Sequence, residues 1–117
     1  MIEYRRLQVS DGPGAVIVRF KDRKILDEAL IQAIGHELEL LKDNLEGEVV
    51  VLNLEEVEFP SIAFLGKLIL FRKWTEQKQV SLRLCDLRRG VQEVFRITRL
   101  NQLFEIFNTE TEALAQH

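Results

Sequence analysis

Residues 49–70, VVVLNLEEVEFPSIAFLGKLIL, contain the pattern that decides the fold. The run from Val49 to Leu54 is almost wholly apolar, which predicts a strand buried on both faces, as in the middle of a parallel sheet. Two acids interrupt the run before a helix that we expect to begin at Ile62. Ser61 suits the N-cap of this helix, because a hydroxyl accepts a hydrogen bond from an amide of the first turn.

The turn between this strand and its helix is the expected functional region. A buried strand that feeds a helix through a short polar turn places that turn at the carboxyl edge of the sheet. Open α/β sheets usually bind their ligands at this edge. We therefore expect residues 55–61 and the first turns of the helix to form the functional surface.

The remaining segments predict alternating strands and helices. Asp11-Gly12-Pro13-Gly14 is a strong turn signal that separates the first two strands as a hairpin. Asp27 suits the N-cap of the first helix, and Thr109 and Glu112 have the spacing of a capping box. The other expected strands are 2–9, 15–20, 80–85 and 103–107, and the expected helices are 27–44, 62–78, 88–98 and a short one from 109.

The resulting order is β-β-α-β-α-β-α-β-α. Strands that alternate with helices require right-handed crossovers and a largely parallel sheet, with the first hairpin antiparallel at one side. We therefore expect an α/β fold, a single small domain over residues 1–117, with a mixed, mostly parallel sheet of about five strands and helices packed on it. In the strand 80–85 the alternation places Val80, Leu82 and Leu84 inward, and Ser81 and Arg83 outward.

Composition narrows the class of protein. The chain has 117 residues, of which 46% are hydrophobic, enough for one ordinary domain. Its formal net charge is -3 with acids and bases interspersed, whereas a nucleic-acid-binding protein normally shows a basic face. The start MIEYRRLQVS lacks the apolar region of a secretory signal, and the single cysteine, Cys85, fits a reducing compartment. We expect a cytoplasmic protein that binds neither nucleic acid nor membrane.

Two stretches resemble one known family. The segment after the central strand is similar to that of the STAS domain, the fold of bacterial anti-sigma factor antagonists, where it commonly reads V-D/E-F-x-D-S-S-G-L-G-x-L. The tail FRITRLNQLFEIF (95–107) is similar to the closing L-x-L-T-G-L-x-x-L-F of that family, with Arg99 in place of the glycine. The matching residues are Val57, Glu58, Phe59, Leu65, Gly66 and Leu68, and the D-S-S-G positions hold Ser61, Ile62, Ala63 and Phe64.

The resemblance implies a function. It implies a protein-binding module without enzymatic activity or cofactor, which binds an anti-sigma factor, including the ATP-binding serine kinase type, and so regulates sigma-factor-dependent transcription. In the family, a loop serine at the helix start accepts phosphate from the partner kinase. That serine falls on Ile62, the preceding aspartate on Ser61, and a second family aspartate on Asn53. The usual serine switch is then absent or rewired.

The sequence allows two interpretations for each of two residues, Ser61 and Phe64. Ser61 is either only an N-cap or a phosphoacceptor displaced by one residue. Phe64 either contacts a partner, as exposed aromatics do at interface hot spots, or packs down onto Leu68 and extends the core. The residues expected to bind the partner are Glu55, Glu56, Glu58, Pro60, Ser61, Ile62, Phe64 and Lys67. The acids among them are either solvated or steer a basic partner.

Other functions have less support in the sequence. The missing D-S-S-G leaves open a STAS scaffold or an assembly component of a signalling complex, and the β-rich N-terminal hairpin could offer an edge for a homo-oligomer. A small-ligand site or an enzyme is disfavoured, because the sequence has no glycine-rich loop of the kind that binds phosphate groups. His36 and His117 have no neighbours at metal-ligand spacing, and Cys85, at the end of a strand, suits an inert core thiol.

Overall fold

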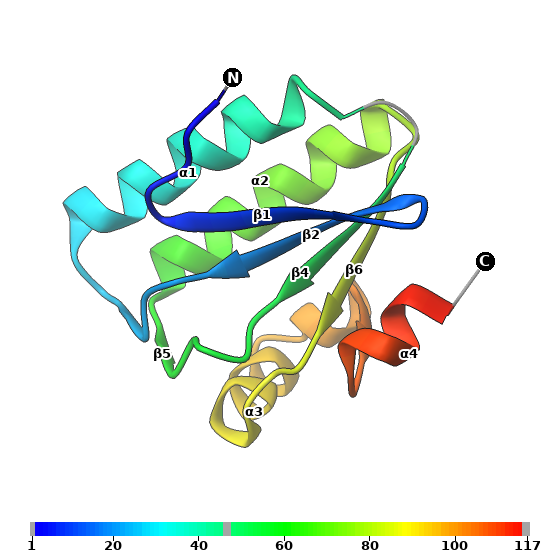
Figure 1. The fold of residues 1–117 in the computed structure, drawn as a ribbon. Coiled ribbons are helices and arrows are strands. Elements are labelled where there is room, and N and C mark those ends of the chain that lie inside the picture. Colours follow the sequence, from blue (N-terminus) through cyan, green and yellow to red (C-terminus); the bar gives the residue numbers. More distant parts are fainter. Residues whose placement is uncertain (1, 46–47, 116–117) are drawn as a thin grey trace.

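A computed structural model of the chain describes residues 2–45 and 48–115. Five strands form one mixed sheet in the order β1-β2-β4-β6-β7, which confirms the expected α/β class (Figure 1). β1 runs antiparallel to β2, and each of the other neighbouring pairs is parallel. The strands are β1 (Leu7–Gly12), β2 (Ala15–Phe20), β4 (Val49–Asn53), β6 (Ser81–Cys85) and β7 (Glu105–Phe107).

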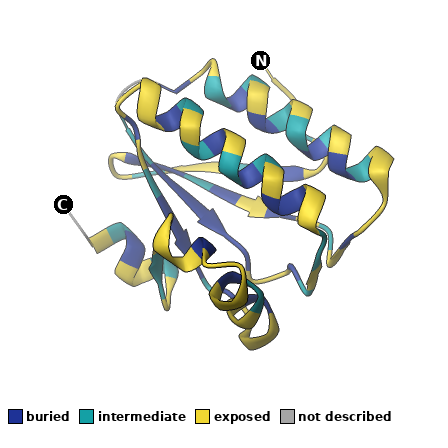
Figure 2. Cartoon of the chain, turned by 180° about the vertical axis from the view of Figure 1, so that it is seen from behind, coloured by how far each residue is buried: buried dark blue, intermediate teal, exposed yellow. Residues whose placement is uncertain are grey.

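Two long helices, α1 (Glu28–Lys42) and α2 (Ile62–Gln77), lie side by side over one face of the sheet (Figure 1). Figure 2 shows their exposed residues on the outer side, away from the strands. One side of α1 is buried against the sheet, at Ile31, Ile34, Leu38 and Leu41, with Ile34 and Leu38 fully inaccessible. The predicted N-cap is confirmed, because the Asp27 carboxylate accepts a hydrogen bond from Leu30 N at 3.1 Å.

The other face of the sheet carries a smaller cover. α4 (Glu110–Ala115) packs Ala113 against Val51 of β4 and Cys85 of β6. Its start has one half of the predicted capping box, because Thr109 Oγ accepts from Glu112 N at 3.1 Å. The Glu112 carboxylate accepts from the Thr109 hydroxyl at 3.2 Å, and not from the backbone amide that a complete capping box uses.

The expectation that Arg83 points outward into solvent is wrong. Arg83 does lie on the face opposite Leu84, but α4 covers that face and leaves the residue 6% exposed. Its Nη1 donates to Ala113 O at 2.8 Å. Alternation along a strand assigns a side chain to one face or the other, and it does not say whether that face is covered.

The first strand also differs from its predicted bounds. β1 begins at Leu7 and continues to Gly12, which pairs with Ala15. The turn is therefore only Pro13-Gly14, with Gly14 at φ +70°, a conformation that glycine adopts without steric cost. Before the strand, the Glu37 carboxylate of α1 accepts from Arg6 N at 3.0 Å and from Leu7 N at 3.1 Å.

Between α2 and the end of the chain, α3 (Arg89–Ile97) leads into a 3-10 turn, η1 (Leu100–Gln102). The predicted strand 103–107 is shortened to β7, because this turn continues as far as Leu103, whose amide donates to Leu100 O at 2.9 Å. Arg99, at the position of the family glycine, has φ +63°. The backbone thus keeps the left-handed turn although its residue has a side chain.

Candidate functional site

The connection from β4 to α2 is held in place from several sides. Leu54 and Val57 anchor it in the core with no exposed surface, and Val57 N donates to Leu54 O at 3.0 Å. Asn53 Oδ1 accepts from Glu55 N at 2.9 Å, and Arg88 Nε donates to Glu55 O at 2.7 Å. We call residues 54–60 the docking loop. These hydrogen bonds engage its backbone at Glu55 and Val57.

A second, two-stranded sheet that the sequence did not reveal fixes the end of this loop. β3 (Lys24–Ile25) pairs in parallel with β5 (Phe59–Pro60). Arg23 O accepts from Glu58 N and Phe59 N at 2.8 and 3.0 Å, and Arg23 Nε donates to the Glu58 carboxylate at 2.9 Å. Glu58 is therefore neutralised by an arginine, whereas Glu55 and Glu56 lie exposed.

The helix after the loop begins where the sequence predicts. Ser61 Oγ accepts from Phe64 N at 3.1 Å, which confirms the N-cap. Pro60 and Ser61 are half-buried, and Ile62 is 73% exposed. Ile62, the first residue of the helix, aligns with the phosphorylated serine of the STAS family. At this position the protein therefore exposes an aliphatic side chain to solvent.

The interpretation of Phe64 as a partner contact is wrong. The ring has no exposed surface and meets Phe20 of β2 edge to face, with 5.3 Å between the ring centroids. A helix places residues two positions apart on different faces, so when Ile62 points outward, Phe64 turns toward the sheet. The alternative that Phe64 extends the core is correct, with Phe20 as its aromatic neighbour.

Four large apolar side chains are exposed on the elements that meet near the start of α2. Leu26 lies beside β3, Phe59 in β5, and Ile62 and Leu70 on α2, with exposed fractions of 58, 49, 73 and 40%. Between α1 and α2 a groove of about 540 Å³ is lined in part by Leu26, Ser61, Ala63 and Leu70. We call Leu26, Phe59, Ile62 and Leu70, with this groove, the apolar corner.

Lys67, an expected partner-binding residue, belongs to the groove wall. It crosses α1 above Gly35, where an added Cβ would lie 2.9 Å from Lys67 Cδ. Its Nζ lies 3.4 Å from the Gln32 side-chain oxygen. The small residue at position 35 therefore lets the lysine stem lie across the helix and keeps the groove narrow at this point.

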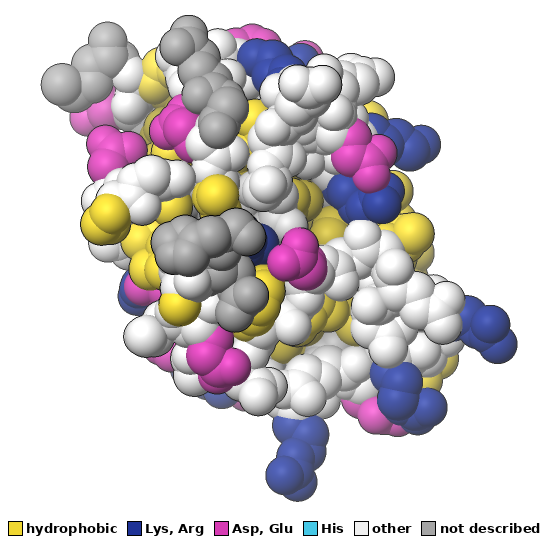
Figure 3. Space-filling view, turned by 90° about the vertical axis from the view of Figure 1, so that its right-hand side faces the viewer, with side chains coloured by type: hydrophobic (Ala, Val, Ile, Leu, Met, Phe, Trp, Pro, Cys, Tyr) yellow, Lys and Arg dark blue, Asp and Glu magenta, His cyan; other side chains and the backbone are white. Residues whose placement is uncertain are grey.

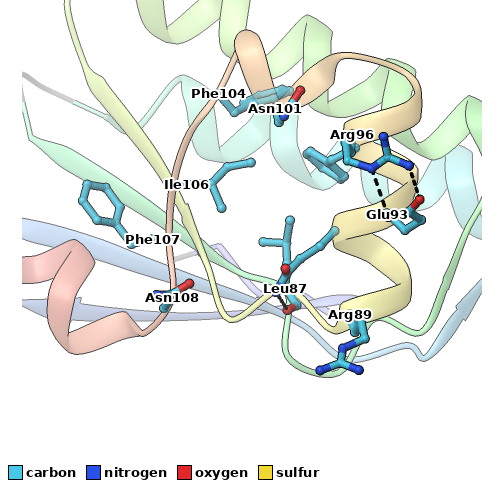
Figure 4. A pocket seen from close by; sticks show the side chains of 11 residues that line it. Leu87, Arg89, Glu93, Arg96, Asn101, Phe104, Ile106, Phe107 and Asn108 are labelled. Atoms are coloured by element: carbon cyan, nitrogen blue, oxygen red, sulfur yellow. Dashed lines mark hydrogen bonds and ion pairs between the residues drawn. The ribbon is translucent and has the colours of Figure 1, made fainter.

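A second cleft of about 400 Å³ lies between α3 and β7 (Figure 4). Apolar side chains such as Leu87, Phe104 and Ile106 line it together with the polar residues Arg89, Gln92, Asn101 and Asn108. Arg96 and Glu93 bond to each other along α3, and this bond lowers the pKa of the Glu93 carboxyl. The titratable side chains described in this lining, Arg89, Glu93 and Arg96, do not form a nucleophile and base pair.

The described residues contain neither a candidate metal site nor a reactive thiol. Among residues 2–45 and 48–115, no three histidine, cysteine, aspartate or glutamate side chains lie together so as to hold a metal ion. Burial raises the pKa of the Cys85 thiol well above its ordinary value, and the adjacent Asp86 adds to the effect. A thiol held protonated is a poor nucleophile.

The surface charge is mixed. On the face shown in Figure 3, acidic and basic side chains are dispersed without a large area of one sign. In the part of the chain that the structure describes, none of the helices combines the length and apolar character needed to cross a bilayer.

Comparison with known proteins identifies a matching family and several structures of similar fold. The model of the STAS domain family matches residues 6–113. A STAS anti-sigma-factor antagonist protein of Planctomyces limnophilus is 22% identical, with a TM-score of 0.83, over 92% of this chain and 94% of that one. An anti-sigma factor antagonist of Mycobacterium paratuberculosis is 17% identical, with a TM-score of 0.79, over 92% and 89%.

A third similar structure is that of the phosphorylated Bacillus cell fate determinant SpoIIAA, 19% identical, with a TM-score of 0.65, over 92% of this chain and 96% of that one. No curated protein sequence matches the chain. At these identities the structural likeness shows the shared fold, and the family match rests on the sequence of nearly the whole chain.

Proposed function

The chain belongs to the STAS domain family, and on this premise we propose that it acts as an anti-sigma factor antagonist does. It binds an anti-sigma factor and thereby regulates sigma-factor-dependent transcription. The mechanism is competitive docking, with no reaction catalysed. Several structures that share its fold are described as anti-sigma factor antagonists, which supports this general role.

The observation that carries the proposal is the apolar corner. Leu26, Phe59 and Ile62 stay exposed near the start of α2, and Leu70 stays exposed in its middle. The same helix buries Phe64, Leu65, Leu68 and Phe71. Full burial of one such side chain against a partner is worth about 1.5–3 kcal/mol. Ile62, the most exposed of the four, is the expected centre of the contact.

The docking loop supports binding in two further ways. The loop backbone donates to Arg23 O and Asn53 Oδ1 and accepts from Arg88 Nε, so less conformational entropy is lost when a partner binds. Glu55 and Glu56 stand exposed beside the apolar corner, so a partner with a basic rim is attracted to it.

We further propose that this docking is not controlled by a phosphate at the helix start. Ile62 has no hydroxyl, and Ser61 Oγ already accepts from Phe64 N. A phosphate on Ser61 would add about -1.5 to -2 charge beside the apolar corner. Incubation with a cognate anti-sigma factor kinase should leave the intact mass unchanged. Stoichiometric phosphate on Ser61 would contradict this part of the proposal.

The surface is tested with a matched pair of substitutions. Ile62→Ser removes an isoleucine that is 73% exposed in α2, and Ile97→Ser removes one that is 67% exposed at the end of α3. Each variant is titrated by calorimetry with each anti-sigma factor of the source genome. Ile62→Ser should lower the affinity for the anti-sigma factor that binds by about 10- to 100-fold. Ile97→Ser should change affinity less than about twofold.

Equal effects of the two substitutions would show that the partner docks elsewhere. A second candidate function, a STAS scaffold in a signalling assembly, is favoured only by the altered D-S-S-G positions. Light scattering separates the two: large self-assemblies that bind none of the anti-sigma factors would support the scaffold.

A further inference from the structure

Asn53, the last residue of β4, is the polar residue on which three parts of the molecule converge. It is 4% exposed and lies on the same face as Val51, the face that α4 covers. Its Nδ2 donates to Asp86 Oδ2 at 3.2 Å and to Glu110 Oε1 at 3.0 Å. Its Oδ1 accepts from Glu55 N at 2.9 Å in the docking loop.

These contacts require an amide at position 53. Carboxylates only accept hydrogen bonds and a backbone N–H only donates, so the amide nitrogen must face the two acids and the oxygen must face Glu55 N. An aspartate would keep the bond to Glu55 N, but it would bring a third carboxylate against Asp86 and Glu110. A leucine would leave both acids and the amide of Glu55 without this partner.

The contact to Glu110 joins the docking loop to α4. The same carboxylate oxygen, Glu110 Oε1, accepts from Arg19 Nη2 of β2 at 2.7 Å. Glu110 is therefore fixed on the sheet at the point where it orients the Asn53 amide. If α4 leaves the sheet, the amide keeps Asp86 as its only acceptor among these contacts and is held less firmly, which weakens its bond to Glu55 N.

We propose that Asn53 is a positioning residue through which α4 holds the docking loop in its binding conformation. The relevance of this coupling to partner binding rests on the proposed function. The coupling itself is a property of the free protein, so a ligand or partner that displaces α4 would loosen a loop on the other side of Asn53.

The experiment compares Glu110→Ala with Glu110→Gln by amide hydrogen exchange of the free protein, followed by NMR. Alanine removes the acceptor, and glutamine keeps a carbonyl oxygen for Asn53. Glu110→Ala should speed exchange at Glu55 N and Val57 N about tenfold, and Glu110→Gln less than about threefold. Amides in the middle of α1, on the opposite face of the sheet, serve as the internal reference. Faster exchange in α4 with an unchanged docking loop would overturn the coupling.

Asn53→Asp is the second variant, because it keeps the size of the side chain and the bond to Glu55 N. It should speed exchange in α4, through repulsion of Glu110, by about tenfold, and unchanged exchange in α4 would also overturn the proposal. Affinity for an anti-sigma factor is measured separately on Glu110→Ala. A loosened loop with unchanged affinity would leave the coupling intact and would contradict the docking loop as the contact surface.

Discussion

The two faces of the sheet are covered in different ways. On one face, α1 and α2 bury a continuous set of aliphatic and aromatic side chains, among them Phe20, Phe64 and Phe71. On the other face, the six residues of α4 add a small apolar contact around Ala113. That cover is held by polar groups, in particular Arg83 to Ala113 O and Glu110 to Arg19 and Asn53.

The two kinds of cover have different consequences for the stability of the fold and for the coupling of α4 to the loop. Apolar burial is not directional, so the first face can tolerate changes of similar volume without changing what it touches. Hydrogen bonds between buried polar groups depend on the identity of both partners. The second face therefore contributes less to the free energy of unfolding, and it transmits a change at α4 to a specific loop.

The largest expected effect is on the first face. Phe64→Ala removes a fully buried ring that contacts Phe20, and it should lower the free energy of unfolding by about 3–5 kcal/mol in urea titrations. Ile62→Ala, two residues earlier in the same helix but 73% exposed, should change it by less than about 0.5 kcal/mol. Similar losses for the two variants would mean that Phe64 is not part of the core.

An intermediate effect is expected at Cys85, on the second face, and it depends on pH. Burial raises the pKa of its thiol in the folded protein, whereas the unfolded thiol ionises near about pH 8.5. Above that pH the unfolded state binds fewer protons, so stability falls as pH rises. Above about pH 8.5 the stability of the wild type relative to Cys85→Ala should fall with a slope that approaches about 1.4 kcal/mol per pH unit by about pH 10.

Urea titrations of both proteins across this pH range give the comparison. The difference between them isolates the thiol, because Tyr4, whose pKa is also raised by burial and by Glu37, is present in both. Parallel pH profiles would show that the thiol titrates equally in the folded and unfolded states.

The smallest effect is expected at the start of α4. Thr109→Ala removes the hydroxyl that accepts from Glu112 N, and loss of such a cap costs about 1 kcal/mol. Because α4 is held by few contacts, the change should appear as faster exchange at Ala113 N, with the urea midpoint nearly unchanged. Thr109→Ser, which keeps the oxygen, is the control. A large shift in the urea midpoint would show that α4 unfolds only with the whole domain.

Local signals in the sequence predicted the first face well. The N-caps expected at Asp27 and Ser61 are observed as hydrogen bonds at the starts of α1 and α2. The run from Val49 predicted a central strand, and β4 has a parallel neighbour on each side. In these cases the information lies within a few residues of the element that it specifies.

The rest depended on contacts between distant segments. Burial of Arg83 requires α4, which lies 30 residues later, and the apolar corner requires β3 to lie beside β5. At Phe64, the sequence left a partner contact and core packing both open, and only the position of α2 on the sheet shows that the ring is buried. Asn53 stood out in the sequence only as a departure from the family pattern, because its three partners come from positions 55, 86 and 110.

The carboxylate of Glu37 covers the beginning of an edge strand of the sheet. The outer edge of β1 would otherwise present amide groups to any extended chain, a common route to aggregation. Glu37 binds two of those amides, at Arg6 and Leu7. An extended chain would have to displace this carboxylate before it could pair with the beginning of β1.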